Sequence, residues 1–467
     1  MDEIMLRAAS ATAELTRSSA HQRAGWLRAV ADTLDAITTQ LVDAVDEETH
    51  LGRSRLTGEV ARTTGQLRLF ADVIIEGSYL EAIVDHADPH AQPPRPDLRR
   101  MLRPIGPVAV YAASNFPFAF SVAGGDTASA LAVGCPVVVK AHPGHPKTSA
   151  LTASAVADAL AAAGAPDGTF ALVDGYQAGV DLVQHPVIAA AAFTGSATGG
   201  RALHDLAAAR PAPIPFYGEL GSINPVIVTE AADAARGEEL ADGLAGSFTL
   251  GTGQFCTKPG VVFVPEGSQL LRRLADRELP AERAMLTDSI GDGFARGLDR
   301  LLGIPGLDIV AGSPAGALAV TLSVEHFAEH RERVLTEVFG PVTVMVRYAG
   351  REQLRDALDQ LDGSLTATLH AEADEDIEEV TAALERIAGR VLFSGWPTGV
   401  AVTWAQHHGG PWPATTSQFT SVGATAVRRF LRPIAYQDAP QAVLPAALRE
   451  ENPLGIPRRV DGVLVLP

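Results

Sequence analysis

One segment of the chain reads Gly251-Thr252-Gly253-Gln254-Phe255-Cys256-Thr257-Lys258-Pro259-Gly260, and it holds one of only two cysteines among 467 residues. A cysteine amid glycines, with no histidine beside it, is not typical of a metal ligand or of half a disulfide. It is typical of a nucleophile that other groups must approach closely. We therefore interpret Cys256 as a candidate nucleophile. The alternative is a buried structural cysteine, which is how we interpret Cys135.

Two segments upstream of Cys256 carry further reactive groups. One places a carboxylate between glycines, Phe216-Tyr217-Gly218-Glu219-Leu220-Gly221, and the other places an amide in a turn, Ser114-Asn115-Phe116-Pro117-Phe118. A thiol, a carboxylate and an amide together can supply a nucleophile, a base and an oxyanion donor. Between its glycines, Glu219 is expected to have room to swing and to activate water. Taken singly, the two residues would be a solvated loop carboxylate and a turn asparagine.

Composition sets limits on the class of protein. A chain of 467 residues predicts about two to three domains, and 46% hydrophobic with 20% charged residues is typical of a globular enzyme. A net charge of −18 argues against nucleic-acid binding. No apolar run reaches the roughly 20 residues of a membrane span, and the start Met1-Asp2-Glu3-Ile4 does not resemble a secretion signal. Two cysteines favour the reducing cytoplasm.

The pattern of apolar residues along the chain predicts an α/β protein. Residues 1–80 have helical apolar spacing, and residues 81–103 form a loop or an extended arm. Strands then alternate with helices over 104–222 and again over 223–404, which predicts two doubly wound parallel sheets. The tail, 431–467, ends in an apolar strand that needs a partner edge.

These segments, in this order, resemble the aldehyde dehydrogenase superfamily, and the resemblance spans roughly residues 103–423. It also rests on three further segments: Phe193-Thr194-Gly195-Ser196, Glu337-Val338-Phe339-Gly340-Pro341 and Gly395-Trp396-Pro397-Thr398-Gly399-Val400. The resemblance implies oxidation of an aldehyde to an acid through a thioester on Cys256, with Asn115 as oxyanion donor and Glu219 as base. It implies a cofactor-binding domain (1–80, 104–222 and part of 405–430), a catalytic domain (223–404) and a small β oligomerisation arm (81–103 and 431–467). A homo-oligomer, dimer or tetramer, follows from that arm.

The resemblance also assigns the cofactor, NAD or NADP. Gly195 and Ser196 become the dinucleotide-binding turn at a helix N-terminus. The strand-end Lys140 would bind the adenosine ribose, while Glu337 and Phe339 would hold the nicotinamide ribose and pack near the ring. NAD-selective members usually carry a glutamate three residues after this lysine. Pro143 stands there instead, and the neighbouring basic residues His142, His145 and Lys147 favour NADP or dual use.

A narrower resemblance is to the α-ketoglutarate semialdehyde (2,5-dioxopentanoate) dehydrogenases. It rests on the segments Ser114–Ser121, Thr366–His370 and Thr420–Gly423. Other aldehyde specificities, transfer of the thioester to coenzyme A and a non-catalytic member of the fold are the alternatives. No substrate-carboxylate site is defined by the sequence, and Arg103 and Arg283 are the candidates. His407-His408 is interpreted as a structural loop, and no metal site is predicted.

Overall fold

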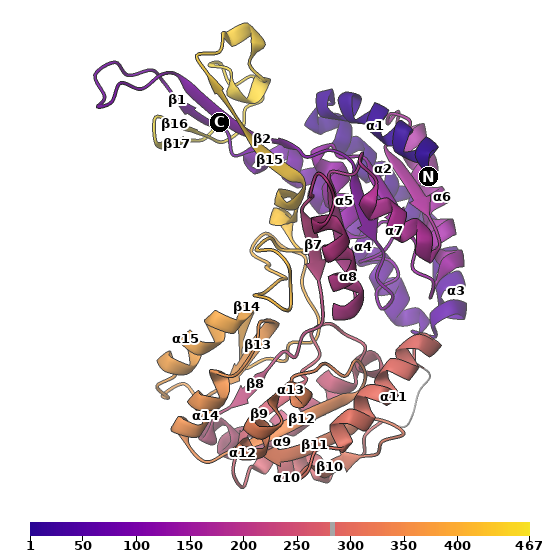
Figure 1. The fold of residues 1–467 in the computed structure, drawn as a ribbon, viewed down its shortest axis with the longest axis vertical. Coiled ribbons are helices and arrows are strands. Elements are labelled where there is room, and N and C mark those ends of the chain that lie inside the picture. The colour runs from indigo at the N-terminus through magenta and orange to yellow at the C-terminus, as the bar shows by residue number, and fades with distance from the viewer. Residues whose placement is uncertain (281–284) are drawn as a thin grey trace.

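The structure is a computed structural model, and it describes residues 1–280 and 285–467. The described residues contain a five-stranded parallel sheet, a seven-stranded sheet and a separate five-stranded arm sheet. Figure 1 shows the arm reaching away from the N-terminal half of the chain, while the seven-stranded sheet lies at the opposite end of the molecule. The predicted α/β fold with two parallel-sheet regions and a small β arm is confirmed.

Four helices form the start of the chain, as the apolar spacing predicts: α1 (Asp2–Arg17), α2 (Ala20–Ala36), α3 (Thr38–Thr49) and α4 (Arg53–Glu76). Ser19 and Gln22 form a capping box that starts α2. Helices α2 and α4 pack on each other, and their apolar faces join the core that also covers the first parallel sheet. Helix α4 ends at Gly77, whose φ of 85° suits glycine at a helix end.

The first parallel sheet has the order β5-β4-β3-β6-β7. Its strands are β3 (Val108–Tyr111), β4 (Val137–Lys140), β5 (Phe170–Val173), β6 (Ala190–Thr194) and β7 (Phe216–Glu219), and its helices are α5 (Gly125–Val133), α6 (Pro146–Ala162), α7 (Tyr176–Gln184) and α8 (Ala197–Ala208). The chain runs outward from β3 in one direction and from β6 in the other. The carboxyl ends of β3 and β6 therefore form a switch point, where such sheets bind ligands.

Helix α6 is capped at its N-terminus by a residue from another helix. Pro146 occupies the first helical position, and the Glu48 carboxylate accepts hydrogen bonds from the backbone N–H groups of Lys147 (2.8 Å) and Thr148 (3.0 Å). A side chain from α3 thus caps α6, and sequence-local rules do not include such a distant cap.

The second sheet has the order β10-β11-β12-β9-β8-β13-β14 and is parallel except for the edge strand β10. Its strands are β8 (Val226–Val228), β9 (Val261–Pro265), β10 (Asp308–Gly312), β11 (Leu318–Ser323), β12 (Val342–Tyr348), β13 (Ser364–His370) and β14 (Ala388–Phe393). Its helices are α9 (Glu230–Thr249), α10 (Gln269–Ala275), α11 (Asp288–Leu302), α12 (Val324–Glu329), α13 (Arg331–Val334), α14 (Arg351–Leu358) and α15 (Glu378–Ile387).

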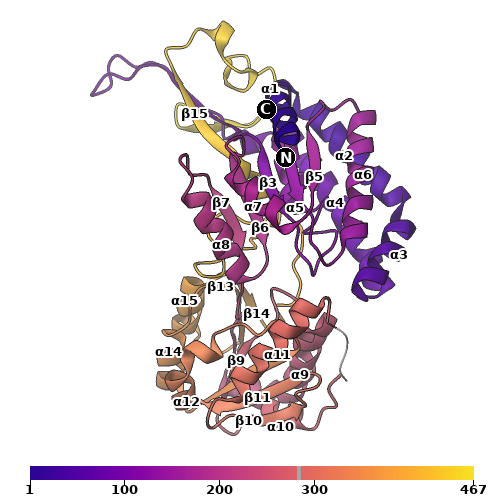
Figure 2. The same cartoon turned by 45° about the vertical axis from the view of Figure 1, so that its right-hand side comes forward.

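The arm sheet combines the two segments predicted for it. It has the order β15-β2-β1-β16-β17, from β1 (Ile83–Asp85), β2 (Leu98–Pro104), β15 (Leu431–Gln437), β16 (Arg458–Val460) and β17 (Val463–Val465). The apolar tail strand pairs with β16, while its other edge and its side chains are exposed. Figure 2 shows β15 leading away from the rest of the molecule. The predicted domain boundaries remain a prediction.

Among the described residues, none of the helices combines the length and the apolar character that a bilayer crossing requires.

Candidate active site

Glu219 is the last residue of β7 and is only 3% exposed. Its Oε1 accepts a hydrogen bond from Nε2 of His408 at 3.0 Å, and its Oε2 accepts one from the Ser421 hydroxyl at 2.7 Å. The expected freedom to swing is therefore not what the structure shows. The carboxylate is held from both oxygens by a loop nearly 200 residues further along the chain.

The Cys256 thiol lies beside the same nitrogen of this imidazole. Its Sγ is 3.6 Å from Nε2 of His408, and the sulfur, nitrogen and carboxylate atoms all lie within 4.8 Å of one another. Three segments that are distant in sequence thus bring a nucleophile, an imidazole and a carboxylate together. This set also matches the ligands that Zn²⁺ takes. A metal ion there would occupy both Cys256 and Glu219, so metal binding and the predicted chemistry exclude each other.

His407-His408 was interpreted as a structural loop; the structure places His408 in a loop and, beyond that interpretation, brings it against Glu219 and Cys256. It is fully buried, and its Nδ1 has no hydrogen-bond partner among the described residues. A carboxylate 3.0 Å from Nε2 requires a donor there, and an unpaired buried acceptor costs less than an unpaired buried N–H. The proton is therefore assigned to Nε2, and the imidazole N–H faces both Glu219 and the Cys256 sulfur.

The environment shifts the pKa values of Glu219 and Cys256 in opposite directions. Burial alone would raise the pKa of Glu219, but the electrostatic attraction and hydrogen bond of the His408 N–H, together with the Ser421 hydroxyl, outweigh it, so this pKa lies below its ordinary value. Burial, then the neighbouring carboxylates of Glu219 and Glu337, hold the pKa of the Cys256 thiol well above its ordinary value, against the opposing charge of Arg62. At neutral pH the resting site therefore holds a carboxylate and a protonated thiol.

The backbone before Cys256 is unusually shaped. Gly251, Thr252 and Gly253 have φ values of 56°, 59° and 65°, and a β-branched residue such as Thr252 rarely adopts this conformation. A Cβ on Gly253 would lie 2.3 Å from the Gly340 carbonyl carbon, so the cysteine loop packs backbone to backbone against the 337–341 segment. Strain of about 1–3 kcal/mol at Thr252 must be held by such packing. Backbone strain of this kind close to a reactive residue such as Cys256 is typical of a functional site.

Asn224 and Asn115 fix the two ends of this loop. The Asn224 side-chain amide donates to the carbonyls of Cys256 (2.8 Å) and Lys258 (2.9 Å), a role that the sequence analysis missed. The Asn115 amide donates to the Gln254 carbonyl at 3.0 Å, two residues before the thiol. The Asn115 turn is in turn held by Arg55, whose Nη2 donates to the Asn115 carbonyl at 2.6 Å. The structure thus brings Asn115, Glu219 and Cys256 into one site.

Comparison with known proteins decides the family. The model of the aldehyde dehydrogenase family matches residues 1–278, more than half of the chain. The chain belongs to the aldehyde dehydrogenase family. The α-ketoglutaric semialdehyde dehydrogenase 2 of Azospirillum brasilense is 48% identical over 94% of this chain and 87% of its own length. The α-ketoglutaric semialdehyde dehydrogenase of Acinetobacter baylyi is 43% identical over 99% of this chain and 91% of its own length.

Solved structures share the fold of this aldehyde dehydrogenase. The 1-pyrroline-5-carboxylate dehydrogenase from Thermus, solved with bound NAD, superposes with a TM-score of 0.77 and 20% identity. That likeness covers 93% of this chain and 84% of the Thermus chain. The likeness supports the fold, while the family match and the two relatives make the protein an aldehyde-oxidising oxidoreductase.

The residues expected to bind the cofactor fit a dinucleotide at the switch point of the first sheet. Lys140 ends β4 in register with Tyr111 of β3, which is in register with Phe193 of β6. Residues 195–198, which include Gly195 and Ser196, are exposed at the start of the 12-residue helix α8. An exposed helix N-terminus beside a strand-end lysine suits a pyrophosphate and a ribose.

His142 does not have the charge that the NADP expectation gave it. Burial, with smaller effects from His145 and Lys140, lowers its pKa to about 3, and its Nδ1 accepts a hydrogen bond from the Gly144 N–H. His145 is fully buried and lies against the Ala113 carbonyl and the Ser149 hydroxyl. Both imidazoles are therefore neutral at pH 7 and cannot attract a 2′-phosphate by charge.

Glu337 and Phe339 lie between α13 and β12, both half-buried. Glu337 faces inward, since a Cβ on Gly221 would lie 2.6 Å from its Oε2. Burial raises the pKa of Glu337, although the buried Lys258 ammonium opposes the rise. The structure places this carboxylate close to the catalytic loop, residues 251–260, which fits a cofactor ribose held beside Cys256.

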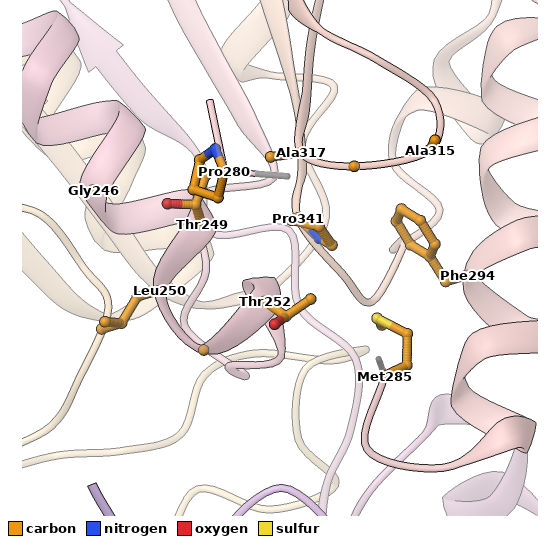
Figure 3. A pocket seen from close by; sticks show the side chains of 12 residues that line it. Gly246, Thr249, Leu250, Thr252, Pro280, Met285, Phe294, Ala315, Ala317 and Pro341 are labelled. Carbon is orange, nitrogen blue, oxygen red and sulfur yellow. The ribbon is translucent and has the colours of Figure 1, made fainter. Parts of the chain in front are cut away.

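A cavity of about 270 Å³ borders the catalytic loop (Figure 3). Leu250, Thr252, Met285, Phe294 and Pro341 are among the residues that line it. Cys256, Glu219 and Asn115 are not part of this lining. The cavity therefore borders the Leu250–Gly253 turn without containing the reacting groups.

The candidates for a substrate-carboxylate site lie elsewhere. Arg103 belongs to β2 of the arm sheet, opposite Arg432 of β15, and is not part of the catalytic cluster. Arg283 falls among residues 281–284, outside the described residues. Two other arginines are close enough to Cys256 to interact with it through their charge: Arg62 of α4 and Arg390 of β14.

Proposed function

We propose that this enzyme oxidises α-ketoglutarate semialdehyde to α-ketoglutarate with NAD(P), through a thioester on Cys256. The observation that carries the mechanism is the cluster in which His408 Nε2 lies 3.6 Å from the Cys256 sulfur and 3.0 Å from the Glu219 carboxylate. The substrate assignment is supported by the names of the two relatives, at 48% and 43% identity over nearly the whole chain.

The first half-reaction joins the aldehyde carbon to the Cys256 sulfur. The thiol must lose its proton first, and Glu219 and His408 are the neighbouring groups through which that proton can leave. The developing thiolate then gains a donor in the His408 N–H, and the alkoxide gains the Asn115 amide and the Cys256 backbone N–H. Asn115 carries two amide hydrogens, so one can stay on the Gln254 carbonyl while the other turns to the substrate. The nicotinamide, when bound, accepts the hydride.

The second half-reaction breaks the thioester. Glu219 is ionised and buried beside Cys256, so it can take a proton from a water molecule that attacks the thioester carbonyl. The carbon–sulfur bond then breaks, and the acid leaves while Cys256 regains its thiol. The presence of this base supports hydrolysis over transfer to coenzyme A.

Initial rates test the substrate assignment. We expect kcat/KM for α-ketoglutarate semialdehyde to exceed that for pentanal, an uncharged aldehyde of the same length, without added coenzyme A. Equal values for the two aldehydes would leave only the family activity. A requirement for coenzyme A would replace hydrolysis by acyl transfer.

We also propose that the enzyme accepts NADP as well as NAD. Pro143 stands three residues after Lys140, where a glutamate would repel a 2′-phosphate. The cations close to this position are Lys140 and Lys147 rather than the histidines. Parallel kcat/KM values with NAD and NADP test this, and an undetectable rate with NADP would refute it.

The exposed β17 edge supports a homo-oligomer, and the two unpaired cysteines support a cytoplasmic enzyme.

Replacing His408 should change the pH dependence of hydrolysis. In His408→Ala, burial of Glu219 is no longer offset by the imidazole, so the pKa of this carboxyl rises. The base form is then lost at higher pH, and we expect the acid limb of the kcat profile to move to higher pH. The matched control is His407→Ala, which removes the adjacent histidine outside the cluster. An unchanged acid limb in His408→Ala would contradict the assigned role.

A further inference from the structure

One face of α4 presents three charged residues to the Asn115 turn. Arg55, Glu59 and Arg62 follow the spacing i, i+4, i+7, which places them on the same side of a helix. The Glu59 carboxylate is buried and accepts hydrogen bonds from the backbone N–H groups of Phe118 (2.9 Å) and Ala119 (3.1 Å). These hydrogen bonds to Glu59 hold α4 against the turn that carries Asn115.

The two guanidinium groups lie over an aromatic cluster next to the reacting groups. The Arg55 Cζ is 5.2 Å from the centre of the Phe116 ring and 4.9 Å from that of Phe255, the residue before Cys256. The Arg62 Cζ is 5.7 Å from the Phe116 ring centre and 5.2 Å from that of Phe120. The Phe120 ring centre lies 6.2 Å from that of His408. Arg62 is therefore separated from the catalytic imidazole by a single phenyl ring.

The two arginines differ in what they bind. Arg55 donates to the Asn115 carbonyl, so it positions the catalytic turn. The Nε and Nη2 atoms of Arg62 are buried, and neither has a hydrogen-bond partner among the described residues. The Glu59 carboxylate is close enough to attract the Arg62 guanidinium electrostatically. Among the described residues, the two side chains form no hydrogen bond with each other. Buried donors of a charged group without partners are costly, and an anionic ligand would satisfy them.

We propose that Arg62 binds the carboxylate of the substrate through Nε and Nη2, while the aldehyde end reaches Cys256 across Phe116 and Phe120. The substrate class is then a short aldehyde with a carboxylate at its other end. Adjacent guanidinium N–H groups match the two oxygens of a carboxylate, which a lysine cannot reproduce. The inference rests on the proposed function for the identity of the substrate, but it applies to any aldehyde of this class.

A different role for Arg62 makes a different prediction. Its positive charge lowers the pKa of the Cys256 thiol, so it could act on the nucleophile alone. In that case its removal would slow charged and uncharged aldehydes equally. A carboxylate-binding role slows the charged aldehydes far more than the uncharged ones.

The experiment compares Arg62→Met and Arg62→Lys with wild type on α-ketoglutarate semialdehyde, 5-oxopentanoate and pentanal. We expect Arg62→Met to lose roughly 100-fold or more in kcat/KM on both carboxylated aldehydes, mostly through KM, and to lose far less on pentanal, where only the effect of Arg62 on the thiol is removed. Arg62→Lys should recover part of the loss. Arg55→Met should slow all three aldehydes alike. The matched control is Arg68→Met, because Arg68 lies on the same helix but pairs on the surface with Asp32 and Asp35.

Equal losses on all three aldehydes, or no loss on the carboxylated ones, would overturn the proposal. So would a wild-type enzyme that does not prefer carboxylated aldehydes. Failure of the proposed function alone would look different: 5-oxopentanoate would be preferred to α-ketoglutarate semialdehyde while the Arg62 effect remained. If Arg62→Met is inactive throughout, binding of α-ketoglutarate to Cys256→Ser protein, with and without Arg62→Met, decides by calorimetry. Binding that survives Arg62→Met, in a protein with an unchanged melting temperature, refutes the proposal.

Discussion

Cys256→Ser is expected to lose aldehyde oxidation by roughly 10⁴-fold or more in kcat/KM, because the covalent step requires the sulfur nucleophile. The site would ionise a hydroxyl even less readily than the thiol. The pKa of the thiol is already held high by burial and by the carboxylates of Glu219 and Glu337, and a serine in the same place starts from a far higher pKa. The steady-state rate of cofactor reduction measures the loss, and NAD(P) binding to the variant should persist.

Cys135→Ala is the matched control for this change. Cys135 is fully buried, and its Sγ lies 3.5 Å from the Phe430 carbonyl in the core of the N-terminal half. Burial raises its pKa to about 11, so it is inert at neutral pH. We expect this variant to keep full activity with a small loss of stability. Cys256→Ser protein that still turned over aldehyde at a wild-type rate would refute the thioester mechanism.

Much of the fold could be predicted because local patterns dominate it. The strands β3, β4 and β9 are short apolar runs that each follow a proline or a glycine, which is the pattern that identifies a buried strand in a sequence. The edge strand β10 is different. Strand β10 is largely exposed and flanked by glycines, so it has neither the apolar run nor the alternation that identifies a strand.

The site was predicted only where motifs are contiguous. Cys256, Glu219 and Asn115 each sit in a short recognisable segment, but His408 reaches Glu219 across 189 residues and has no local signal beyond a loop histidine. Arg55 and Arg62 were missed for another reason. Charged residues at helical spacing usually mark a solvated face, and only the packing of α4 on the Asn115 turn makes this face internal. The spacing of Arg55, Glu59 and Arg62 was the available signal.

Glu219→Gln is expected to separate the two half-reactions. The amide is isosteric and can accept the His408 hydrogen bond, but it cannot take a proton from water. We expect one burst of reduced cofactor per active site, followed by a steady-state kcat lowered about 10²–10⁴-fold, because the thioester forms and then persists. Stopped-flow absorbance measures the burst, and mass spectrometry of the quenched protein detects the acyl group.

The same substitution should shift the pH dependence of the first step, which distinguishes loss of a base from general damage to the site. The Glu219 carboxylate raises the pKa of the Cys256 thiol, so removing its charge lowers that pKa. The thiolate then forms at lower pH, and the pH dependence of the burst rate should move toward acid while hydrolysis is nearly lost. A distorted site would slow both phases without this shift. A variant with unchanged kcat and no burst would assign the base to another group, and His408 would be the first to test because its Nε2 lies beside the same sulfur.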